Sequence, residues 1–261
     1  MNDDLGFIGI GRIAAAVVEG VATSSGPTPR MWVSPRNTAK SAELAMRFAT
    51  VTVAADNQGV VDSSGIVLLC VRPQAAAEVL KALKFDPGLT IISLIPIPLE
   101  ATVPLVAPAS RIFRVLPLPP CARRLGAVPY WPRDESIHQL LSRLGRPLPL
   151  ASEQELSVLW AATAMIAPFY SLLETVSQWS VEKGVDSATA ADHTAAMFQA
   201  VASVAQEGKP DRFAHLAAEA ATPGGLNEQA LGLLRDAAAF QHVREALDAI
   251  LTRISRPPAG T

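Results

Sequence analysis

The sequence Leu5-Gly6-Phe7-Ile8-Gly9-Ile10-Gly11-Arg12-Ile13-Ala14 contains an apolar run, a glycine-rich corner and the start of an amphipathic pattern. Its small residues fit G-x-G-x-x-A, the strand-to-helix turn that binds the pyrophosphate of a dinucleotide. Gly9 permits the tight turn, Gly11 lets the backbone approach the phosphates, and Ala14 keeps the helix close to the strand. The free N–H groups at the helix start face the phosphates, so Arg12 and Ile13 join Gly9 and Gly11 in the predicted cofactor site.

The end of the second predicted strand, Arg30–Ser34, indicates which dinucleotide is bound. An Asp or Glu there would accept hydrogen bonds from the ribose of NAD, but the chain continues Ser34-Pro35-Arg36-Asn37-Thr38-Ala39-Lys40. The hydroxyl of Ser34 and the cations of Arg36 and Lys40 suit a 2′-phosphate, which Arg can hold bidentately. The sequence therefore predicts NADP(H) rather than NAD(H). The alternative is that Arg36 and Lys40 are solvated charges at a helix start.

Strand and helix patterns then alternate as far as residue 144, which predicts an α/β fold with a Rossmann-type doubly wound sheet. The apolar run Ser64–Val71 is typical of a parallel strand covered on both faces. Because ligands lie beyond the carboxyl ends of such strands, the residues that follow should border the cofactor. The additional cofactor residues predicted in this way are Asn57, Val71, Arg72 and Pro73.

The composition and the hydrophobic pattern of the chain change after residue 150. From Glu153 to Ile254 the sequence is rich in Ala and no run has a strand pattern, which predicts an all-helical second domain. We therefore expect a cofactor-binding domain over residues 1–150, a helical domain over residues 151–255 and a disordered tail over residues 256–261. The helical pattern over Leu156–Lys183 is interrupted at Pro168, where a helix must kink or restart.

Composition narrows the classes of partner. The net charge of −2 and the pI near 6.1 give no electrostatic reason to expect a nucleic acid or an anionic membrane as a partner. The mean hydropathy of +0.26 is high, yet no uninterrupted apolar run reaches the roughly 18 residues of a membrane span. We expect the excess apolar surface in a subunit interface and the protein in the cytoplasm. The four His and two Cys show no spacing suited to a metal, so no metal site is predicted.

Several motifs, in order, resemble those of the pyrroline-5-carboxylate reductases, the NADPH-dependent enzymes of the last step of proline synthesis. They are Gly6-Phe7-Ile8-Gly9-Ile10-Gly11, Val71-Arg72-Pro73-Gln74, Arg114-Val115-Leu116-Pro117, Ala167-Pro168-Phe169-Tyr170 and Thr222-Pro223-Gly224-Gly225. The resemblance extends over nearly the full chain. It implies a helical domain that interlocks with a second subunit in a homodimer, and it leaves a higher oligomer open. It also implies an active site between the nicotinamide and the Pro-Gly-Gly turn.

The resemblance places the substrate at this turn. Thr222 and the amides of Gly224 and Gly225, in the turn opened by Pro223, would hold a carboxylate. Asn227 takes the place beside the imine nitrogen, where its amide donates a hydrogen bond but cannot act as a general acid, so water or an iminium supplies the proton. Two alternatives stay open: Asn227 as a helix N-cap, and Tyr170 as a core aromatic instead of a pocket residue.

The departures from the family lie where the substrate site should be most constrained. The chain has Pro117-Leu118-Pro119-Pro120 for Pro-Asn-Thr-Pro, Pro96-Ile97 for Ala-Gly, Met165-Ile166-Ala167 for Gly-Ser-Gly, and one hydroxyl residue instead of two before Pro-Gly-Gly. Polar groups are thus exchanged for apolar ones at several points. Such a pocket should bind something larger, more apolar or less dependent on a carboxylate than pyrroline-5-carboxylate.

Three hypotheses for the function follow. The first is an NADPH-dependent reductase of a small cyclic imine or imino acid, similar to pyrroline-5-carboxylate reductase but with a remodelled pocket. The alternative is a dimeric NADP(H)-binding protein of the same fold with little or no catalysis. A third keeps the oxidoreductase chemistry but exchanges the imine for a carbonyl or hydroxy acid, and it lacks a Lys, His or Asp at a recognisable catalytic position.

Overall fold

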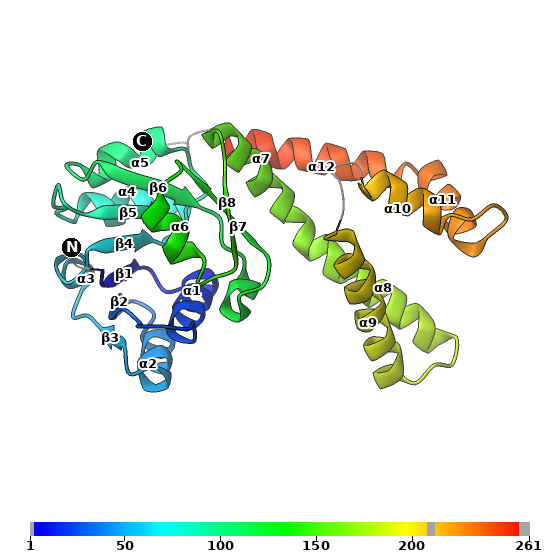
Figure 1. Cartoon of the computed structure of the whole chain (residues 1–261), viewed down its shortest axis with the longest axis horizontal. Coiled ribbons are helices and arrows are strands. Elements are labelled where there is room, and N and C mark those ends of the chain that lie inside the picture. The colour runs from blue at the N-terminus through cyan, green and yellow to red at the C-terminus, as the bar shows by residue number, and fades with distance from the viewer. Residues whose placement is uncertain (1–2, 208–211, 256–261) are drawn as a thin grey trace. The chain divides into compact units, whose positions relative to one another are not determined.

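The computed structural model describes residues 3–207 and 212–255, and the chain forms two compact units (Figure 1). One unit holds the chain up to Trp160 together with the segment from Leu251, and the other runs from Ala161 to Ile250. The first unit contains the sheet and the second is helical. The predicted tail, residues 256–261, lies outside the described residues.

The first unit is built on one eight-stranded sheet. Its strands are β1 (Leu5–Ile8), β2 (Met31–Val33), β3 (Val51–Val53), β4 (Ile66–Leu69), β5 (Thr90–Ser93), β6 (Arg111–Val115), β7 (Ala127–Trp131) and β8 (Arg146–Pro149). The spatial order is β3-β2-β1-β4-β5-β6-β7-β8, and β1 to β6 are parallel. This is the strand order of dinucleotide-binding folds. The predicted doubly wound sheet is therefore confirmed.

Beyond β6 the sheet continues with two strands of different kinds. β7 runs antiparallel to β6, and β8 pairs with β7 in parallel. The sequence predicted no strand over residues 146–149, and Pro147 and Pro149 in this segment cannot donate to a ladder. β8 lies at the edge of the sheet, where Arg146 and Leu150 donate backbone hydrogen bonds towards β7 and the prolines alternate with them. An edge strand tolerates proline in this arrangement.

Helices cover both faces of the sheet. They are α1 (Arg12–Ala22), α2 (Thr38–Arg47), α3 (Asn57–Asp62), α4 (Pro73–Lys81), α5 (Leu99–Val106) and α6 (Glu135–Leu141), with a 3₁₀ turn η1 (Pro119–Arg123). One apolar core packs α1, α2 and α6 on the sheet, and the other packs α3, α4 and α5 on the opposite face. Successive residues of β4 alternate between the cores, with Leu68 in the first and Val67 and Leu69 in the second. Burial on both faces explains the unbroken apolar run in this strand.

A buried ion pair fastens the start of α7 (Glu153–Ala162) to the sheet. The side chain of Arg114 in β6 is 2% exposed, and its Nη1 donates to Glu153 Oε1 at 2.7 Å and to Ser157 Oγ at 3.4 Å. The same Oε1 accepts the backbone N–H of Leu99, the first residue of α5, at 2.7 Å. The Arg114 guanidinium also lies 5.1 Å from the ring centre of Trp160. One carboxylate therefore joins β6, α5 and α7.

Burial of the Arg114 guanidinium changes its pKa. Desolvation lowers the pKa of Arg114 below its ordinary value, and the hydrogen bond and charge of Glu153 act against this shift. A charge buried to this extent is tolerated only where a partner of opposite sign is held in good geometry.

The helical unit continues from α7 through a 3₁₀ turn, η2 (Thr163–Met165). Its helices are α8 (Ile166–Glu182), α9 (Ser187–Ala205), α10 (Arg212–Ala220), α11 (Leu226–Asp236) and α12 (Ala239–Ile254). Pro168 is the third residue of α8, where its missing N–H has no intrahelical partner to lose. The predicted restart of the helix near Pro168 is thus confirmed.

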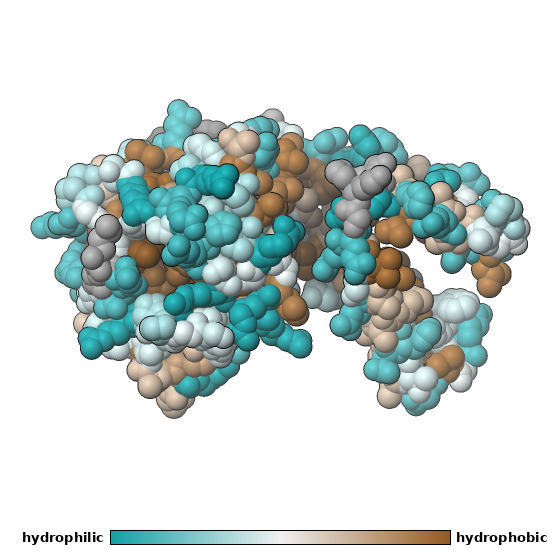
Figure 2. Space-filling model, in the orientation of Figure 1, coloured by the Kyte–Doolittle hydropathy of each residue, from teal (hydrophilic) through white to brown (hydrophobic). Residues whose placement is uncertain are grey.

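This unit buries little of its own apolar surface. Within residues 161–207 and 212–250, the buried side chains are those of Ala161, Ala190 and Thr194. Figure 2 shows apolar residues on the exterior of the helices. The large apolar side chains among the most exposed are Trp179, Val201, Val204, Phe213, Leu226 and Leu233. Large apolar side chains exposed in this number are typical of a surface that contacts another molecule.

One helical stretch, Glu153–Glu182, is long and apolar enough to cross a membrane by length and composition alone. Its most apolar window of 18 residues has a mean hydropathy of 1.6, and 11% of that window is buried in this chain. The sequence predicted no such span because polar residues interrupt every apolar run. A helix enclosed between two subunits has the same composition, so the stretch is consistent with a protein interface as well.

The ion pair gives a stability prediction. Replacing Glu153 with Ala leaves the Arg114 guanidinium buried without its carboxylate, so we expect the free energy of unfolding to fall by about 3–5 kcal/mol. Urea unfolding at fixed protein concentration measures the change. Arg47→Ala, which breaks exposed ion pairs to Glu19 and Glu43, is the control and should cost under about 1 kcal/mol. Equal losses in the two variants would contradict the account.

Candidate cofactor and substrate sites

The glycine turn between β1 and α1 has the geometry that a pyrophosphate requires. Gly9 has φ +94°, and a Cβ added there would lie 3.0 Å from the carbonyl oxygen of Cys70. A Cβ on Gly11 would meet no described atom within 4 Å, so the space beside this residue is open. Gly11 is also the N-cap of α1 and makes no side-chain cap. The first N–H groups of α1 therefore remain free of a capping side chain and can bind an anion.

Ser34 and Asn37, in the segment after β2, hold this turn by hydrogen bonds. The Ser34 hydroxyl accepts the N–H of Gly9 at 2.9 Å, and Ser34 is 1% exposed. The Asn37 amide donates to the carbonyl of Ile10 at 3.0 Å, while its oxygen accepts the N–H of Lys40 and caps α2. The hydroxyl predicted to face a 2′-phosphate is therefore engaged inside the turn. Asn37 was not among the predicted site residues, although an Asn before a helix signals a cap.

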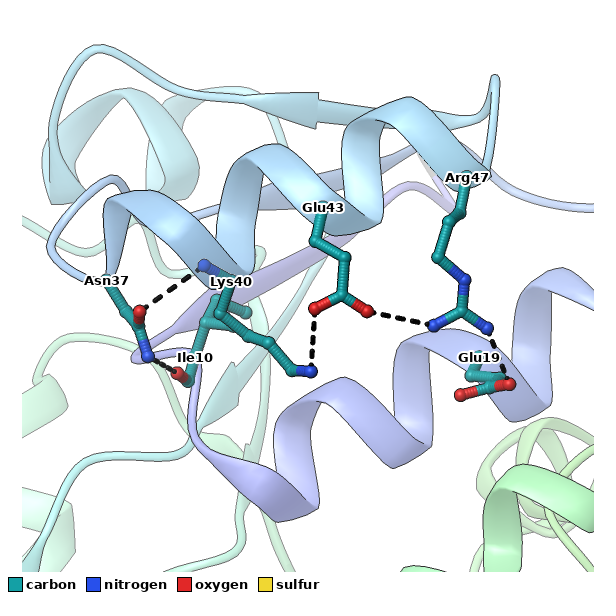
Figure 3. A network of polar contacts seen from close by, with 6 residues as sticks. All are labelled: Ile10, Glu19, Asn37, Lys40, Glu43 and Arg47. Atoms are coloured by element: carbon teal, nitrogen blue, oxygen red, sulfur yellow. Dashed lines mark hydrogen bonds and ion pairs between the residues drawn. The ribbon is translucent and has the colours of Figure 1, made fainter.

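A chain of charges runs from α2 to α1 (Figure 3). The Lys40 ammonium lies 2.8 Å from Glu43, whose other oxygen lies 3.2 Å from Arg47, and Arg47 reaches Glu19 at 2.8 Å. The hydrogen bonds from Lys40 and Arg47 lower the pKa of Glu43 below its ordinary value. Arg36 differs, because it is exposed and its guanidinium makes no hydrogen bond or ion pair with residues 3–207 and 212–255. Among the described residues, Lys40 therefore has a carboxylate partner and Arg36 has none.

The other predicted cofactor residues follow β1, β3 and β4 at their carboxyl ends. Arg72 is the exposed N-cap of α4, and Pro73 is the first residue of that helix. A Cβ on Gly9 would lie 3.2 Å from a methyl group of Val71, so Val71 packs against the glycine turn. Asn57 begins α3. In α1, Arg12 is exposed and Ile13 is partly buried.

The Pro-Gly-Gly turn lies between α10 and α11, in the helical unit. Gly224 has φ +70°, and its N–H donates to Glu228 Oε2 at 2.8 Å. The N–H of Gly225 donates to the carbonyl of Thr222 at 2.8 Å. A Cβ on Gly225 would lie 2.5 Å from the Thr222 hydroxyl, which explains why glycine occupies this position. The Asn227 amide donates to the carbonyl of Ala220 at 3.2 Å.

These contacts bear on the roles predicted for Asn227 and for the amides of Gly224 and Gly225. The helix N-cap is Gly225, so the alternative that Asn227 caps α11 does not hold. The two amides predicted to bind a carboxylate both have acceptors within the chain. Glu228 was not predicted as a site residue. The signal was nonetheless present, because a Glu three residues after an N-cap is the spacing of a capping box.

Tyr170 is 57% exposed, with its ring centre 5.8 Å from that of Phe169. Phe169 in turn contacts Phe198 of α9 edge to face, at 6.0 Å between centres. The alternative that Tyr170 is a core aromatic therefore does not hold within one chain.

Two family models match the chain. Residues 4–96 match the family described as "NADP oxidoreductase coenzyme F420-dependent". Residues 153–256 match the family described as "Pyrroline-5-carboxylate reductase dimerisation". The first match contains the glycine turn, and the second contains the Pro-Gly-Gly turn.

Named relatives and solved structures agree with these matches. A pyrroline-5-carboxylate reductase of Haemophilus influenzae is 28% identical over 263 residues, which span 95% of each chain. The fold is similar to the 1-pyrroline-5-carboxylate reductase of Streptococcus pyogenes, with a TM-score of 0.82, 21% identity and coverage of 96% of this chain and 97% of that one. It is also similar to a pyrroline carboxylate reductase of Plasmodium falciparum with NADP bound, with a TM-score of 0.81, 19% identity and coverage of 97% of each chain.

The open space beside Gly11 gives a binding prediction. Because a Cβ there would meet no described atom within 4 Å, Gly11→Val should fold with a thermal midpoint close to that of the parent protein. The side chain would fill the space that the pyrophosphate needs, so NADPH affinity should fall by at least about 100-fold. Fluorescence titration with NADPH and a thermal melt measure both effects. Retained binding would show that the turn does not hold the cofactor.

Proposed function

The chain belongs to the pyrroline-5-carboxylate reductase family, and from this premise we propose that it is an NADP(H)-dependent reductase of the C=N bond of a cyclic imine. The observation that carries the proposal is the open, uncapped glycine turn in a chain that aligns with such reductases over 95% of its length. We further propose that residues 1–150 bind the cofactor and that residues 151–255 form the dimerisation and substrate domain.

The cofactor supplies the hydride that reduces the imine carbon, and the protein supplies binding and orientation. Gly9 and Gly11, with the first N–H groups of α1, bind the pyrophosphate, and Arg12 and Ile13 lie beside them in that turn. Val71, Arg72 and Pro73 border the cofactor where β4 ends, and Asn57 does so beyond β3. At the substrate turn, Asn227 lies beside the imine nitrogen and Thr222 contributes its hydroxyl. Tyr170, exposed on α8, lines the pocket.

The remodelled pocket is part of the proposal. Leu118, Ile166 and the Pro96-Ile97 pair stand where related enzymes have smaller or more polar groups, so the substrate is larger or more apolar than pyrroline-5-carboxylate. Ile166 begins α8 and is 37% exposed, so its side chain is available to a ligand or a second subunit. An apolar substrate gains affinity from such side chains in proportion to the area that it buries.

We propose a homodimer in the cytoplasm, formed through the helical domain. The support is the exposed apolar surface of α8 to α12 and the family match over residues 153–256. A helical unit with so few buried side chains needs a partner surface to be stable. A second copy of the chain supplies the same apolar surface, as an isologous interface requires.

The guanidinium of Arg36, which has no partner in the part of the chain that the structure describes, gives a test of cofactor choice. Arg36→Ala should weaken NADPH binding by about 10- to 100-fold, the worth of a charge-assisted hydrogen bond, and change NADH binding little. Lys40→Ala is the matched control and should have the smaller effect, because Glu43 already pairs with Lys40. Equal loss of both cofactors in Arg36→Ala would reject the 2′-phosphate assignment.

Turnover of imines tests the function itself. NADPH oxidation is followed at the nicotinamide absorbance with pyrroline-5-carboxylate and with larger and carboxylate-free cyclic imines. We expect at least one imine to be reduced with kcat/KM at or above about 10⁴ M⁻¹ s⁻¹, the lower end of ordinary enzymes. Tight NADPH binding without turnover of any imine would favour the non-catalytic alternative.

A further inference from the structure

The side chain of Asn37 ties the glycine turn to the start of α2 (Figure 3). Its Nδ2 donates to the carbonyl of Ile10 at 3.0 Å, and Ile10 lies between the two glycines of the turn. Its Oδ1 accepts the backbone N–H of Lys40 at 3.3 Å, in the first turn of α2. Arg36, the cation that we assign to the 2′-phosphate, is the residue directly before Asn37. One amide therefore connects the segment that carries this cation with the turn to which we assign the pyrophosphate.

Two further contacts hold α2 at other places. The Ser41 hydroxyl is buried and donates to the carbonyl of Ser34 at 2.8 Å, which fastens α2 to the end of β2. In the last turn, Arg47 pairs with Glu19 at 2.8 Å, but the two side chains are 43% and 36% exposed, so this pair holds the helix weakly. The contact made by Asn37 differs from both, because its partner lies inside the glycine turn.

Asparagine suits this double contact because its amide carries a donor and an acceptor at the same distance from the backbone. Ser and Asp cap helices about as well as Asn does. An ionised Asp accepts hydrogen bonds and cannot donate one, and a Ser hydroxyl ends one bond closer to the backbone. A cap alone could therefore be any of the three residue types, whereas the contact with Ile10 requires the amide.

We propose that Asn37 is a positioning residue for cofactor choice, which holds Arg36 at a fixed place relative to the glycine turn. NADP(H) spans both places, because its 2′-phosphate and its pyrophosphate belong to one molecule. A guanidinium on a long side chain gains a bidentate contact with a phosphate only where its backbone lies within reach. This inference rests on the proposed function, and in particular on Arg36 as the partner of the 2′-phosphate.

A helix cap and a positioning residue predict different results for Asn37→Ser. This variant keeps a cap for α2 and loses the contact with Ile10. If Asn37 only caps the helix, the affinities for NADPH and NADH should change by the same small factor. If Asn37 positions Arg36, the affinity for NADPH should fall by about five- to tenfold and that for NADH by less than about twofold, because NADH has no 2′-phosphate. In the Arg36→Ala background, Asn37→Ser should then cause no further loss.

The experiment is a double-mutant cycle on the Kd of NADPH and of NADH. Fluorescence titration measures both constants for the parent protein, Asn37→Ser, Arg36→Ala and the double variant, below the thermal midpoint of each. Asp186→Ser is the control, because it also exchanges one cap residue for another, at the start of α9 in the helical unit. It should leave both Kd values within about twofold of the parent. If Asn37→Ser does not fold, Asn37→Thr takes its place, since Thr also caps a helix without an amide.

The outcomes separate failure of this inference from failure of the proposed function. A selective loss of NADPH binding in Asn37→Ser that disappears in the Arg36→Ala background supports the inference. Equal loss of both cofactors, no loss, or an additive loss in the double variant overturns it and leaves the assignment of Arg36 standing. If Arg36→Ala itself does not lower NADPH affinity selectively, the assignment of the 2′-phosphate fails and the inference fails with it.

Discussion

The buried contact between Arg114 and Glu153 joins the end of β6 to the starts of α5 and α7. The carboxylate of Glu153, the first residue of α7, accepts hydrogen bonds from the Arg114 guanidinium in β6 and from the first N–H of α5. Removing a guanidinium from water costs free energy of folding, and well-packed apolar groups of similar volume often stabilise a protein as much or more. The pair joins three elements in one register, whereas apolar contacts tolerate sliding. Because ligands of such sheets lie beyond the carboxyl edge, the ion pair fixes elements that border the region where we propose the cofactor binds.

The two glycine turns of the chain are arranged in opposite ways. Around Gly9, neutral groups of Ser34 and Asn37 hold the backbone from the side of the protein, and the space beside Gly11 stays open. Around Gly224, the charged side chain of Glu228 occupies the amide itself. The first arrangement leaves free donors for a phosphate, while the second supplies the acceptor from within the chain. Both turns fit the same short motifs, and they differ in which atoms satisfy the donors.

Much of the fold could be predicted from the sequence, and less of the site. Unbroken apolar runs such as Ser64–Val71 locate buried parallel strands, because both faces of the sheet are covered. The edge strand β8 escaped prediction, because only its place in the sheet makes two prolines tolerable. For the site, residue type indicated which groups could bind a phosphate. It could not show that the Ser34 hydroxyl faces Gly9, since that contact joins residues 25 positions apart.

The apolar departures from the family's motifs lie in residues that we propose as part of the substrate site. Leu118 and Ile166 stand where the resemblance places polar or small groups, so a pocket that they line would offer fewer hydrogen bonds to an anion. The Pro-Gly-Gly turn keeps its glycines, and the N–H groups of Gly224 and Gly225 already have acceptors in Glu228 and Thr222. A substrate that gains its affinity from apolar walls would depend less on these N–H groups.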